Sequence, residues 1–239
     1  MSPSLTLYRV NGSCALVPHC ILTQYAIPFH GVPMEPTPDS SFGSRYRATD
    51  GSLSHEEYLR INPTGYVPCI VVQPDHNDGD DGASGTAIGE MPAVLTYIAS
   101  LLPEKNLLGR TDAQRAKAYE WLCWLSGTLH SLGFAAFWRP ERFVVGEEAK
   151  KEVSVRGREV IDKCYARIEA ALNGREFAVG EGLTVVDFNL YVFWRWGRLI
   201  DVDMERHYPS YGRLMRVVEG LEGVRKAVQV EGKQLYFEE

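Results

Sequence analysis

The sequence lacks the features that mark a membrane protein or a nucleic-acid-binding protein. No uninterrupted apolar run approaches the roughly 20 residues that a helix needs to cross a bilayer. No basic segment followed by an apolar one opens the chain, so we expect no signal peptide. The net charge is −6, and lysine and arginine are not clustered. We therefore expect neither a nucleic acid nor an anionic membrane as a partner.

Cysteine is too scattered to build a scaffold. The five cysteines form neither a C-x-x-C pair nor a spacing typical of zinc ligands: Cys14, Cys20, Cys69, Cys123 and Cys164. A disulfide framework and a metal site are both poor interpretations of an odd, dispersed set. We therefore predict a reduced, cytoplasmic protein with no metal. Its apolar fraction of 45% is enough for a sizeable core.

The first part of the chain, residues 1–103, alternates short strand patterns with brief helical ones. The stretch 5–10 alternates apolar and polar residues and stops at Asn11 and Gly12, a turn signal. Similar patterns predict strands and helices further along: strands at 29–34, 68–72 and 86–88, and helices at 14–25 and 92–101. A strand, a helix and a strand followed by two strands and a helix predict an α/β domain.

Two long polar stretches interrupt this pattern. Residues 73–85 are rich in aspartate and predict a solvated hairpin loop. A calcium loop is a poor alternative, because the bidentate glutamate that it needs at a set position is absent. Residues 36–55 predict a surface loop.

The second part, residues 110–239, has a helical pattern throughout. Apolar residues recur at helical spacing and predict a core stripe, at Ala118, Leu122, Leu125 and Leu129. Residues 151–173 predict a second long helix, and 209–230 predict a last helical segment with a break inside it. Thr184 and Asp187 stand at the two positions of a capping box, so a helix is expected to begin there. The sequence thus predicts an all-α second domain.

Five short motifs occur in an order that resembles one known superfamily. They are GSCALVPH at 12–19, NPTGYVP at 62–68, IGEMPAVLTY at 88–97, the stretch from Tyr119 to Pro140, and the capping box at 184–187. The set resembles the glutathione transferase superfamily, and the first and fourth motifs are similar to those of its bacterial beta class. Each motif alone is a weak signal, whereas five in the right order make a strong one.

This resemblance implies a fold and a co-substrate. It implies an α/β thioredoxin-like N-terminal domain at 1–103 that binds glutathione. It also implies an all-α C-terminal helical bundle at 110–239 that contributes an apolar substrate pocket. A homodimer is implied by the family and is not predicted by the residues alone. The expected partners are glutathione, an apolar small molecule and a second copy of the chain.

The resemblance assigns glutathione to two stretches of the first domain. It implies that Pro68 is cis and that the Val67 backbone pairs with glutathione as an added strand would. A trans proline that opens a strand is the alternative. It also implies that Glu90 meets the α-amino group of the γ-glutamyl residue, while the helix start at Met91 accepts the carboxylate. The alternative for Glu90 is a solvated charge that favours the helix dipole.

Two neighbouring residues compete for the catalytic position. Ser13 and Cys14 lie where the first strand gives way to the first helix, so amides point toward any anion there. The Ser13 hydroxyl or the Cys14 amide could stabilise the glutathione thiolate, since a free thiol with a pKa of about 8.5 is mostly protonated at neutral pH. Cys14 resembles the cysteine of the beta class. It could instead form a mixed disulfide with glutathione, or only pack.

In the second domain, one histidine and two aromatic residues are candidates. His130 lies on a small, polar stripe of its helix, and the resemblance implies that it reaches glutathione or the bound substrate. The alternative is a surface histidine. Phe134 and Trp138 are expected to line the apolar pocket, although aromatic residues at helical spacing are usually core.

The expected function is that of a glutathione transferase, which activates the glutathione thiol for addition to an apolar electrophile. A glutathione-dependent cis–trans isomerase, which adds the thiolate reversibly to a conjugated alkene, is an alternative. Residues 12–14 also resemble the corresponding segment of the zeta-class isomerases. A binding module without activity is a second alternative, and disulfide exchange through Cys14 is a third.

Overall fold

The computed structural model describes residues 4–37, 45–73 and 85–237. The chain divides into two compact units: the first combines Met1–Leu101 with Glu219–Glu239, and the second is Leu102–Val218. The acidic stretch predicted at 73–85 lies almost wholly outside the described residues. The middle of the polar stretch at 36–55 lies outside them too.

The first unit is built on a five-stranded sheet of the order β3-β2-β1-β4-β5. Its strands are β1 (Leu5–Arg9), β2 (His30–Pro36), β3 (Tyr46–Ala48), β4 (Cys69–Val72) and β5 (Thr86–Ile88). β1 and β2 are parallel, and the other neighbouring pairs are antiparallel. Four of these strands lie where the sequence predicts them. β3 does not, because it lies in a stretch predicted as a loop.

The unexpected strand β3 is short and polar. It pairs with the end of β2, where Met34 lies opposite Ala48. The side chains of Arg47 and Glu35 form an ion pair across the two strands, at 2.8 Å. Three residues are too few to show the alternation that identifies a strand. The pairing with β2, and not the local pattern, therefore makes this segment a strand.

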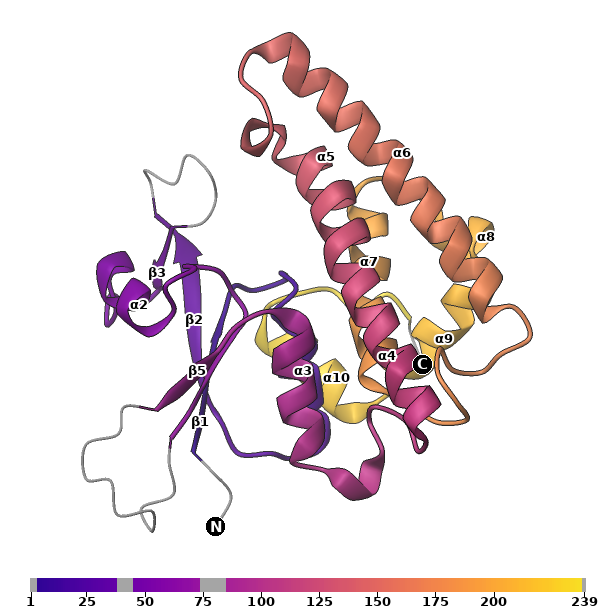
Figure 1. Ribbon diagram of the computed structural model, residues 1–239, viewed down its shortest axis with the longest axis horizontal. Helices are drawn as coiled ribbons and strands as arrows, with labels where there is room; N and C mark the ends of the chain where they lie inside the picture. The colour runs from indigo at the N-terminus through magenta and orange to yellow at the C-terminus, as the bar shows by residue number, and fades with distance from the viewer. Residues whose placement is uncertain (1–3, 38–44, 74–84, 238–239) are drawn as a thin grey trace. The chain divides into compact units, whose positions relative to one another are not determined.

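Side chains of β1 point alternately to the two faces of the sheet, and helices cover both faces. The helices of this unit are α1 (Leu16–Gln24), α2 (His55–Ile61), α3 (Met91–Ser100) and α10 (Glu222–Val230). Leu5 and Leu7 point to one face and are almost fully buried. Tyr8 points to the other face, where its ring centroid lies 5.2 Å from that of Tyr58 on α2. Figure 1 shows α2 on one side of the sheet and α3 and α10 on the other.

No helix is predicted at 55–61, yet α2 forms there. The Ser54 hydroxyl accepts a hydrogen bond from Glu57 N at 3.2 Å, and the Glu57 carboxylate accepts one from Ser54 N at 2.8 Å. This reciprocal capping box satisfies two amides at the start of the helix. A serine followed three residues later by a glutamate is thus the local signal for α2.

The C-terminal segment packs within the first unit, whereas the sequence groups it with the helical domain. α10 lies along α1, and Gly223 N at its start donates to Gln24 Oε1 at 2.8 Å. The buried carboxylate of Glu219 accepts from Tyr236 N at 2.7 Å. A helical stripe indicates that one face of α10 is buried, but it does not indicate which element covers that face.

The second unit is helical, as the sequence predicts. Its longer helices are α4 (Asp112–Trp124), α6 (Glu147–Leu172), α7 (Val185–Leu199) and α9 (Pro209–Glu219). Shorter elements are η1 (Pro103–Lys105), α5 (Ala136–Trp138), η3 (Pro140–Arg142) and α8 (Met204–His207). α4 continues into the π-helix η2 (Leu125–Ala135), in which Ser131 Oγ donates to Ser126 O at 2.9 Å. The π-helix is unexpected, since such segments are rare and rarely exceed one turn.

The core helix α7 begins at the predicted capping box. The Asp187 carboxylate is fully buried and accepts hydrogen bonds from Thr184 N at 2.6 Å and from Thr184 Oγ1 at 2.9 Å. It also accepts from Ala178 N at 2.8 Å, in the segment that precedes the helix. The box therefore starts α7 and also fixes the preceding loop.

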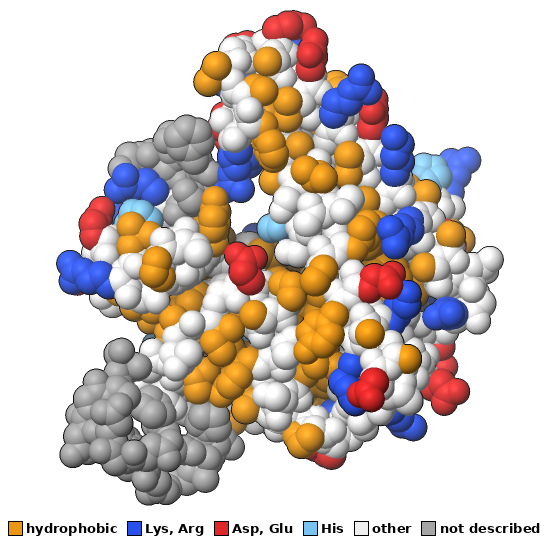
Figure 2. Space-filling view, viewed as in Figure 1, with side chains coloured by type: hydrophobic (Ala, Val, Ile, Leu, Met, Phe, Trp, Pro, Cys, Tyr) orange, Lys and Arg blue, Asp and Glu red, His pale blue; other side chains and the backbone are white. Residues whose placement is uncertain are grey.

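Among the described residues, no helix combines the length and the apolar character that a membrane crossing requires. Figure 2 shows one face of the molecule, on which lysine and arginine side chains are interspersed with aspartate and glutamate. On this face the positive charges do not gather into a single patch.

Candidate active site

The turn between β1 and α1 places Cys14 beside the loop that precedes β4. The Cys14 Sγ donates a hydrogen bond to the main-chain oxygen of Val67 at 3.5 Å. Burial raises the pKa of the Cys14 thiol to about 12. The amides of Cys14 and Ala15 oppose that rise, and the negative charge of Glu90 adds to it. The thiol is therefore protonated at neutral pH and acts here as a hydrogen-bond donor.

Ser13 closes the same turn. Its hydroxyl donates to Val10 O at 2.7 Å and accepts from Ala15 N at 3.1 Å. The single hydroxyl proton is thus used within the turn, and the oxygen satisfies an amide at the start of α1. This geometry gives Ser13 a local structural role, and its catalytic role stays a prediction.

The loop before β4 presents the main chain of Val67. The bond between Val67 and Pro68 is cis, as expected. The preceding carbonyl, that of Tyr66, accepts hydrogen bonds from Tyr58 Oη at 2.6 Å and from Asn62 Nδ2 at 2.8 Å. Asn62 and Tyr58 therefore hold this loop in place, a role that the sequence analysis does not assign. The only local signal is that Asn62 opens the motif that ends at Pro68.

Glu90 stands at the start of α3 in an unusual backbone conformation. Its φ is 60° and its ψ is 124°, in a region that residues other than glycine rarely occupy and that often marks functional sites. Its side chain is exposed and forms no hydrogen bond or ion pair with the described residues. The first bond of the helix runs from Val94 N to Glu90 O, so the amides that precede Val94 have no partner within the helix, and the helix start carries a partial positive charge.

In the second unit, η2, α5 and α7 bring five rings together. They are His130, Phe134, Trp138, Phe193 and Trp196. His130 stacks on Trp196 with the ring centroids 5.4 Å apart. Burial and, to a smaller extent, the positive charge of Arg142 together lower the pKa of the His130 imidazole to about 4. His130 is therefore uncharged at neutral pH.

The two predicted pocket residues have different surroundings. Phe134 is 1% exposed and packs its ring 4.7 Å from Trp138 and 5.0 Å from Trp196, centroid to centroid. Trp138 is 41% exposed, so part of its ring faces solvent. Phe134 thus belongs to the core of the cluster, and Trp138 exposes part of its aromatic ring to solvent. Phe193 was not predicted, although its spacing of three from Trp196 on α7 is the signal that could have found it.

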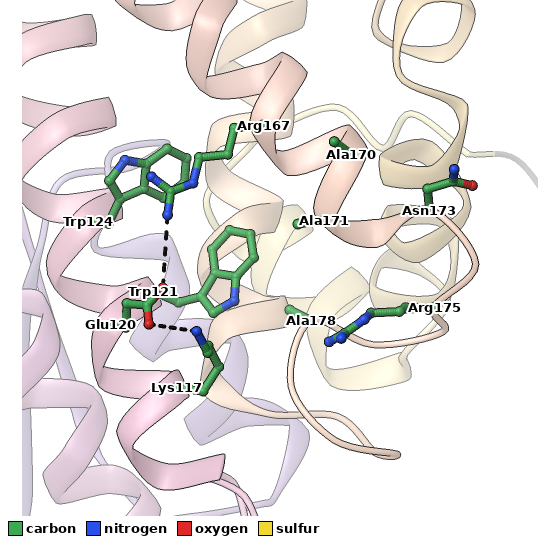
Figure 3. A pocket seen from close by; sticks show the side chains of 10 residues that line it. All are labelled: Lys117, Glu120, Trp121, Trp124, Arg167, Ala170, Ala171, Asn173, Arg175 and Ala178. Carbon is green, nitrogen blue, oxygen red and sulfur yellow. Dashed lines mark hydrogen bonds and ion pairs between the residues drawn. The ribbon is translucent and has the colours of Figure 1, made fainter. Parts of the chain in front are cut away.

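The second unit also carries a surface pocket between α4 and α6, with a volume of about 360 Å³ (Figure 3). Trp121 and Trp124 form its aromatic wall, with their centroids 5.6 Å apart. The guanidinium of Arg167 lies over the Trp124 ring at 4.4 Å, and Lys117 pairs with Glu120 at 2.6 Å. None of the predicted site residues lines this pocket. Within the described part of the chain, no group of three or more His, Cys, Asp or Glu side chains gathers as metal ligands would.

Comparisons with known proteins agree with this architecture. A family model described as "Glutathione S-transferase, C-terminal domain" matches residues 128–222. The glutathione S-transferase GstA of Escherichia coli O157:H7 is 26% identical over 231 residues, which cover 95% of this chain and 99% of the relative. The glutathione S-transferase GST-4.5 of Xanthomonas campestris pv. campestris is 25% identical over 234 residues, with the same two coverages. A sphingomonad glutathione S-transferase solved with glutathione is 26% identical, with a TM-score of 0.74, over 95% of this chain and 98% of that one.

The five-stranded α/β unit and the helical unit define this chain as a protein of the glutathione S-transferase fold, as predicted. The chain is thus similar over 95% of its length to glutathione S-transferases, and its residues 128–222 match the model of that family's C-terminal domain.

Proposed function

We propose that this chain binds glutathione in its first unit and activates the thiol for addition to an apolar electrophile. The observation that carries the proposal is the contact between Cys14 and Val67, at 3.5 Å, in the same unit as the start of α3. A thiol donor, a main-chain edge and a helix start are three groups that a tripeptide with a thiol and two carboxylates would use. The superfamily and its enzymatic class support the same conclusion.

Cys14 is proposed as the hydrogen-bond donor to the glutathione sulfur. Because its own pKa is about 12, it keeps its proton at neutral pH and does not compete as a nucleophile. Rotation about its Cα–Cβ bond turns the S–H group from the Val67 carbonyl toward a bound thiolate. Each unit by which the thiol pKa of glutathione falls corresponds to about 1.4 kcal/mol of stabilisation of the thiolate. Ser13 is proposed to shape the turn, so that the amides of the helix start add to this stabilisation.

The rest of glutathione is proposed to lie between Val67 and the start of α3. The Val67 main chain pairs with the peptide as an added strand would. The Glu90 carboxylate, which has no partner among the described residues, meets the α-amino group of the γ-glutamyl residue. The γ-glutamyl carboxylate meets the helix start at Met91, where the helix dipole favours a negative charge.

The aromatic cluster of the second unit is proposed to provide the surface for the apolar substrate. Trp138 presents a partly exposed ring, and the buried ring of Phe134 packs against it. His130 is retained as a predicted binding residue. Its neutral imidazole can donate or accept one hydrogen bond, but it adds no positive charge at neutral pH.

Calorimetric titration with glutathione tests the binding half of the proposal. Saturable binding of one glutathione per chain is the expected result, and no binding at high millimolar concentration would contradict it. The reaction is tested by following glutathione during turnover of an electrophile. Conjugation consumes glutathione stoichiometrically, whereas an isomerase leaves it unchanged and a binding module produces no turnover.

We also propose, from the family, that the protein works as a homodimer in the cytoplasm. Light scattering coupled to size-exclusion chromatography measures the mass in solution. A mass of one chain, 26.8 kDa, would contradict the dimer.

A further inference from the structure

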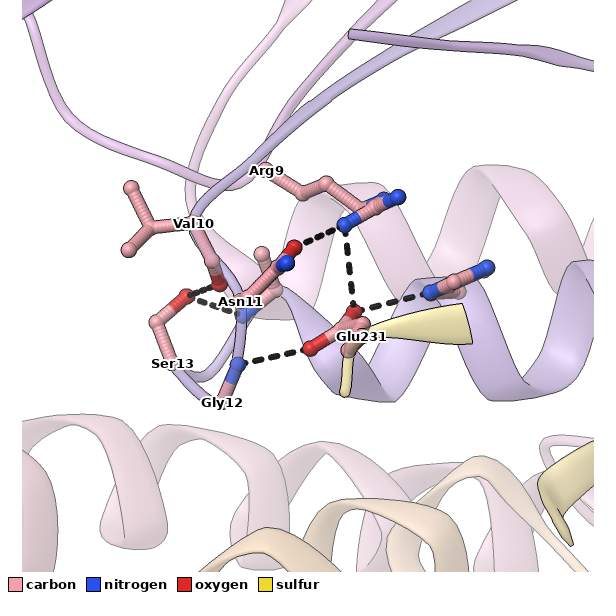
Figure 4. A network of polar contacts seen from close by, with 8 residues as sticks. Arg9, Val10, Asn11, Gly12, Ser13 and Glu231 are labelled. Carbon is pink, nitrogen blue, oxygen red and sulfur yellow. Dashed lines mark hydrogen bonds and ion pairs between the residues drawn. The ribbon is translucent and has the colours of Figure 1, made fainter. Parts of the chain in front are cut away.

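The carboxylate of Glu231 lies inside the first unit and holds the turn that leads to Cys14. Glu231 directly follows α10, and its side chain is fully buried. Its Oε2 accepts a hydrogen bond from Gly12 N at 2.6 Å (Figure 4). Its Oε1 lies 2.8 Å from Nδ1 of His19, a residue of α1. Glu231 and Gly12 are 219 residues apart in sequence, so no local pattern predicts this contact.

Arg9 completes the network from the end of β1. Its Nη1 lies 3.8 Å from Glu231 Oε1 and also donates to Asn11 Oδ1. Burial lowers the pKa of the Arg9 guanidinium, and the negative charge of Glu231 opposes that effect. Removing one member of such a buried set leaves a charge or an amide without its partner. The network therefore ties residues 9–12 firmly to the C-terminal segment.

The contact between Glu231 and Gly12 matters for the glutathione site because Gly12 directly precedes Ser13 and Cys14. The φ of Gly12, +78°, is a left-handed conformation that glycine adopts without strain. On the C-terminal side, Lys233 Cε lies only 2.6 Å from where a Cβ on Gly12 would stand, so the segment fits closely against the turn. A shift of the Gly12 amide would redirect Cys14, and errors of about 1 Å in such groups strongly lower turnover.

A second buried glutamate in the same unit provides a comparison. Glu219 accepts hydrogen bonds from Tyr236 N at 2.7 Å and from Phe237 N at 2.5 Å. Like Glu231, it is almost fully buried and it satisfies main-chain amides. These amides belong to the end of the chain and not to the turn at Gly12. Loss of either glutamate should destabilise the unit, but Glu231 holds the amide of Gly12, whereas Glu219 holds those of Tyr236 and Phe237.

We propose that Glu231 is a positioning residue of the glutathione site. It holds the Gly12 amide and thereby the direction of the Cys14 side chain, although it is not itself a group that touches the substrate. The proposal rests on the proposed function, because it assumes that Cys14 serves glutathione. It makes the C-terminal segment a part of the glutathione site.

The test compares Glu231→Ala and Glu231→Gln with Glu219→Gln in the full chain. The readouts are Tm and the steady-state kcat and KM for glutathione, with 1-chloro-2,4-dinitrobenzene as the electrophile. Substitutions at both Glu231 and Glu219 should lower Tm. Glu231→Ala should lower kcat/KM for glutathione at least 10-fold, and Glu231→Gln only about 3-fold, since its amide oxygen still accepts from Gly12 N. Glu219→Gln should stay within 2-fold of the wild type.

Two results would overturn the proposal. One is a Glu231→Gln variant with the same kcat/KM as Glu219→Gln, a comparison that stands even where Glu231→Ala does not fold. The other comes from hydrogen exchange of the amides of Gly12 and Cys14, which needs no ligand. Exchange there should be faster in Glu231→Gln than in Glu219→Gln, and equal rates would overturn the proposal. If the wild type does not use glutathione, the proposed function fails, and the exchange experiment still decides whether Glu231 holds the turn.

Discussion

The thiol of Cys14 donates to the carbonyl of Val67 and so joins two segments that lie 53 residues apart in sequence. One segment is the turn before α1, and the other is the loop before β4. Their contact places a thiol donor beside the main chain of Val67.

Cys14 should be unreactive for a cysteine near an active site. Its pKa of about 12 keeps the thiolate fraction very small at neutral pH, and the thiolate is the nucleophile. We expect iodoacetamide to alkylate Cys14 at pH 7.5 at least about 10-fold more slowly than the exposed Cys123. Peptide mass spectrometry against time measures both rates. Equal rates would contradict the protonated thiol and favour exchange chemistry at Cys14.

Glu90 should matter for glutathione binding and little for stability. Its carboxylate is exposed and unpaired among the described residues, so Glu90→Gln changes the charge and almost nothing else. We expect the Kd for glutathione to rise several-fold, which corresponds to about 1 kcal/mol, with Tm nearly unchanged. Calorimetry measures the Kd. An unchanged Kd removes Glu90 from the site.

His130 should make stability depend on pH. In the unfolded chain its pKa is about 6.5, and in the folded chain it is lowered to about 4. The unfolded state therefore binds the extra proton first, and stability falls as the pH drops from about 6.5 to about 4. The expected loss is on the order of 3 kcal/mol. Above pH 7 this group contributes no pH dependence.

Urea unfolding at pH 5 and at pH 7 measures this effect. His130→Phe, which keeps an aromatic ring in the cluster, should remove most of the difference between the two pH values. His207, on the exposed side of α8, is the control, and His207→Phe should leave the difference intact. A pH dependence that survives in His130→Phe would mean that another group is responsible.

Asp187 should be a main determinant of the stability of the second unit. Asp187→Ala leaves the buried amides of Thr184 and Ala178 without an acceptor, so we expect a loss of about 2–4 kcal/mol. Asp203 caps the short helix α8 at an exposed position, through Arg206 N at 3.2 Å. Asp203→Ala should therefore lose only about 0.5–1 kcal/mol. Chemical unfolding measures both variants, and similar losses would contradict the special role of Asp187.

Substitution of Phe134 should mainly lower stability, whereas substitution of Trp138 should mainly weaken binding of the apolar substrate. Phe134 is buried, so Phe134→Ala should destabilise the unit by about 3–5 kcal/mol. Trp138 is partly exposed, so Trp138→Ala should lose less stability but raise the KM for an apolar electrophile several-fold. The KM for glutathione should not change in Trp138→Ala. An unchanged KM for the electrophile would place the apolar site elsewhere.

Local chemistry explains which parts of the fold and site could be predicted. β1 alternates apolar and polar residues, and the box at Thr184 and Asp187 satisfies helix amides within four residues. Such signals lie within a few residues of the element that they form. The cis bond at Pro68 is different, because it was implied only by the resemblance of NPTGYVP to a stretch of the superfamily. The missed helix α2 had an equally local signal, in Ser54 and Glu57.

Local patterns in the sequence predict the strands and helices with strong periodicity, the order of the α/β and helical parts, and a resemblance to the glutathione transferase superfamily. Contacts in the folded chain, by contrast, make β3 a strand, pack residues 219–237 with the first unit and bring Glu231 to Gly12. The physical reason is that these features depend on contacts between residues far apart in the chain. Periodicity shows that a face is buried or that a charge needs a partner, and only the folded chain shows which partner it finds.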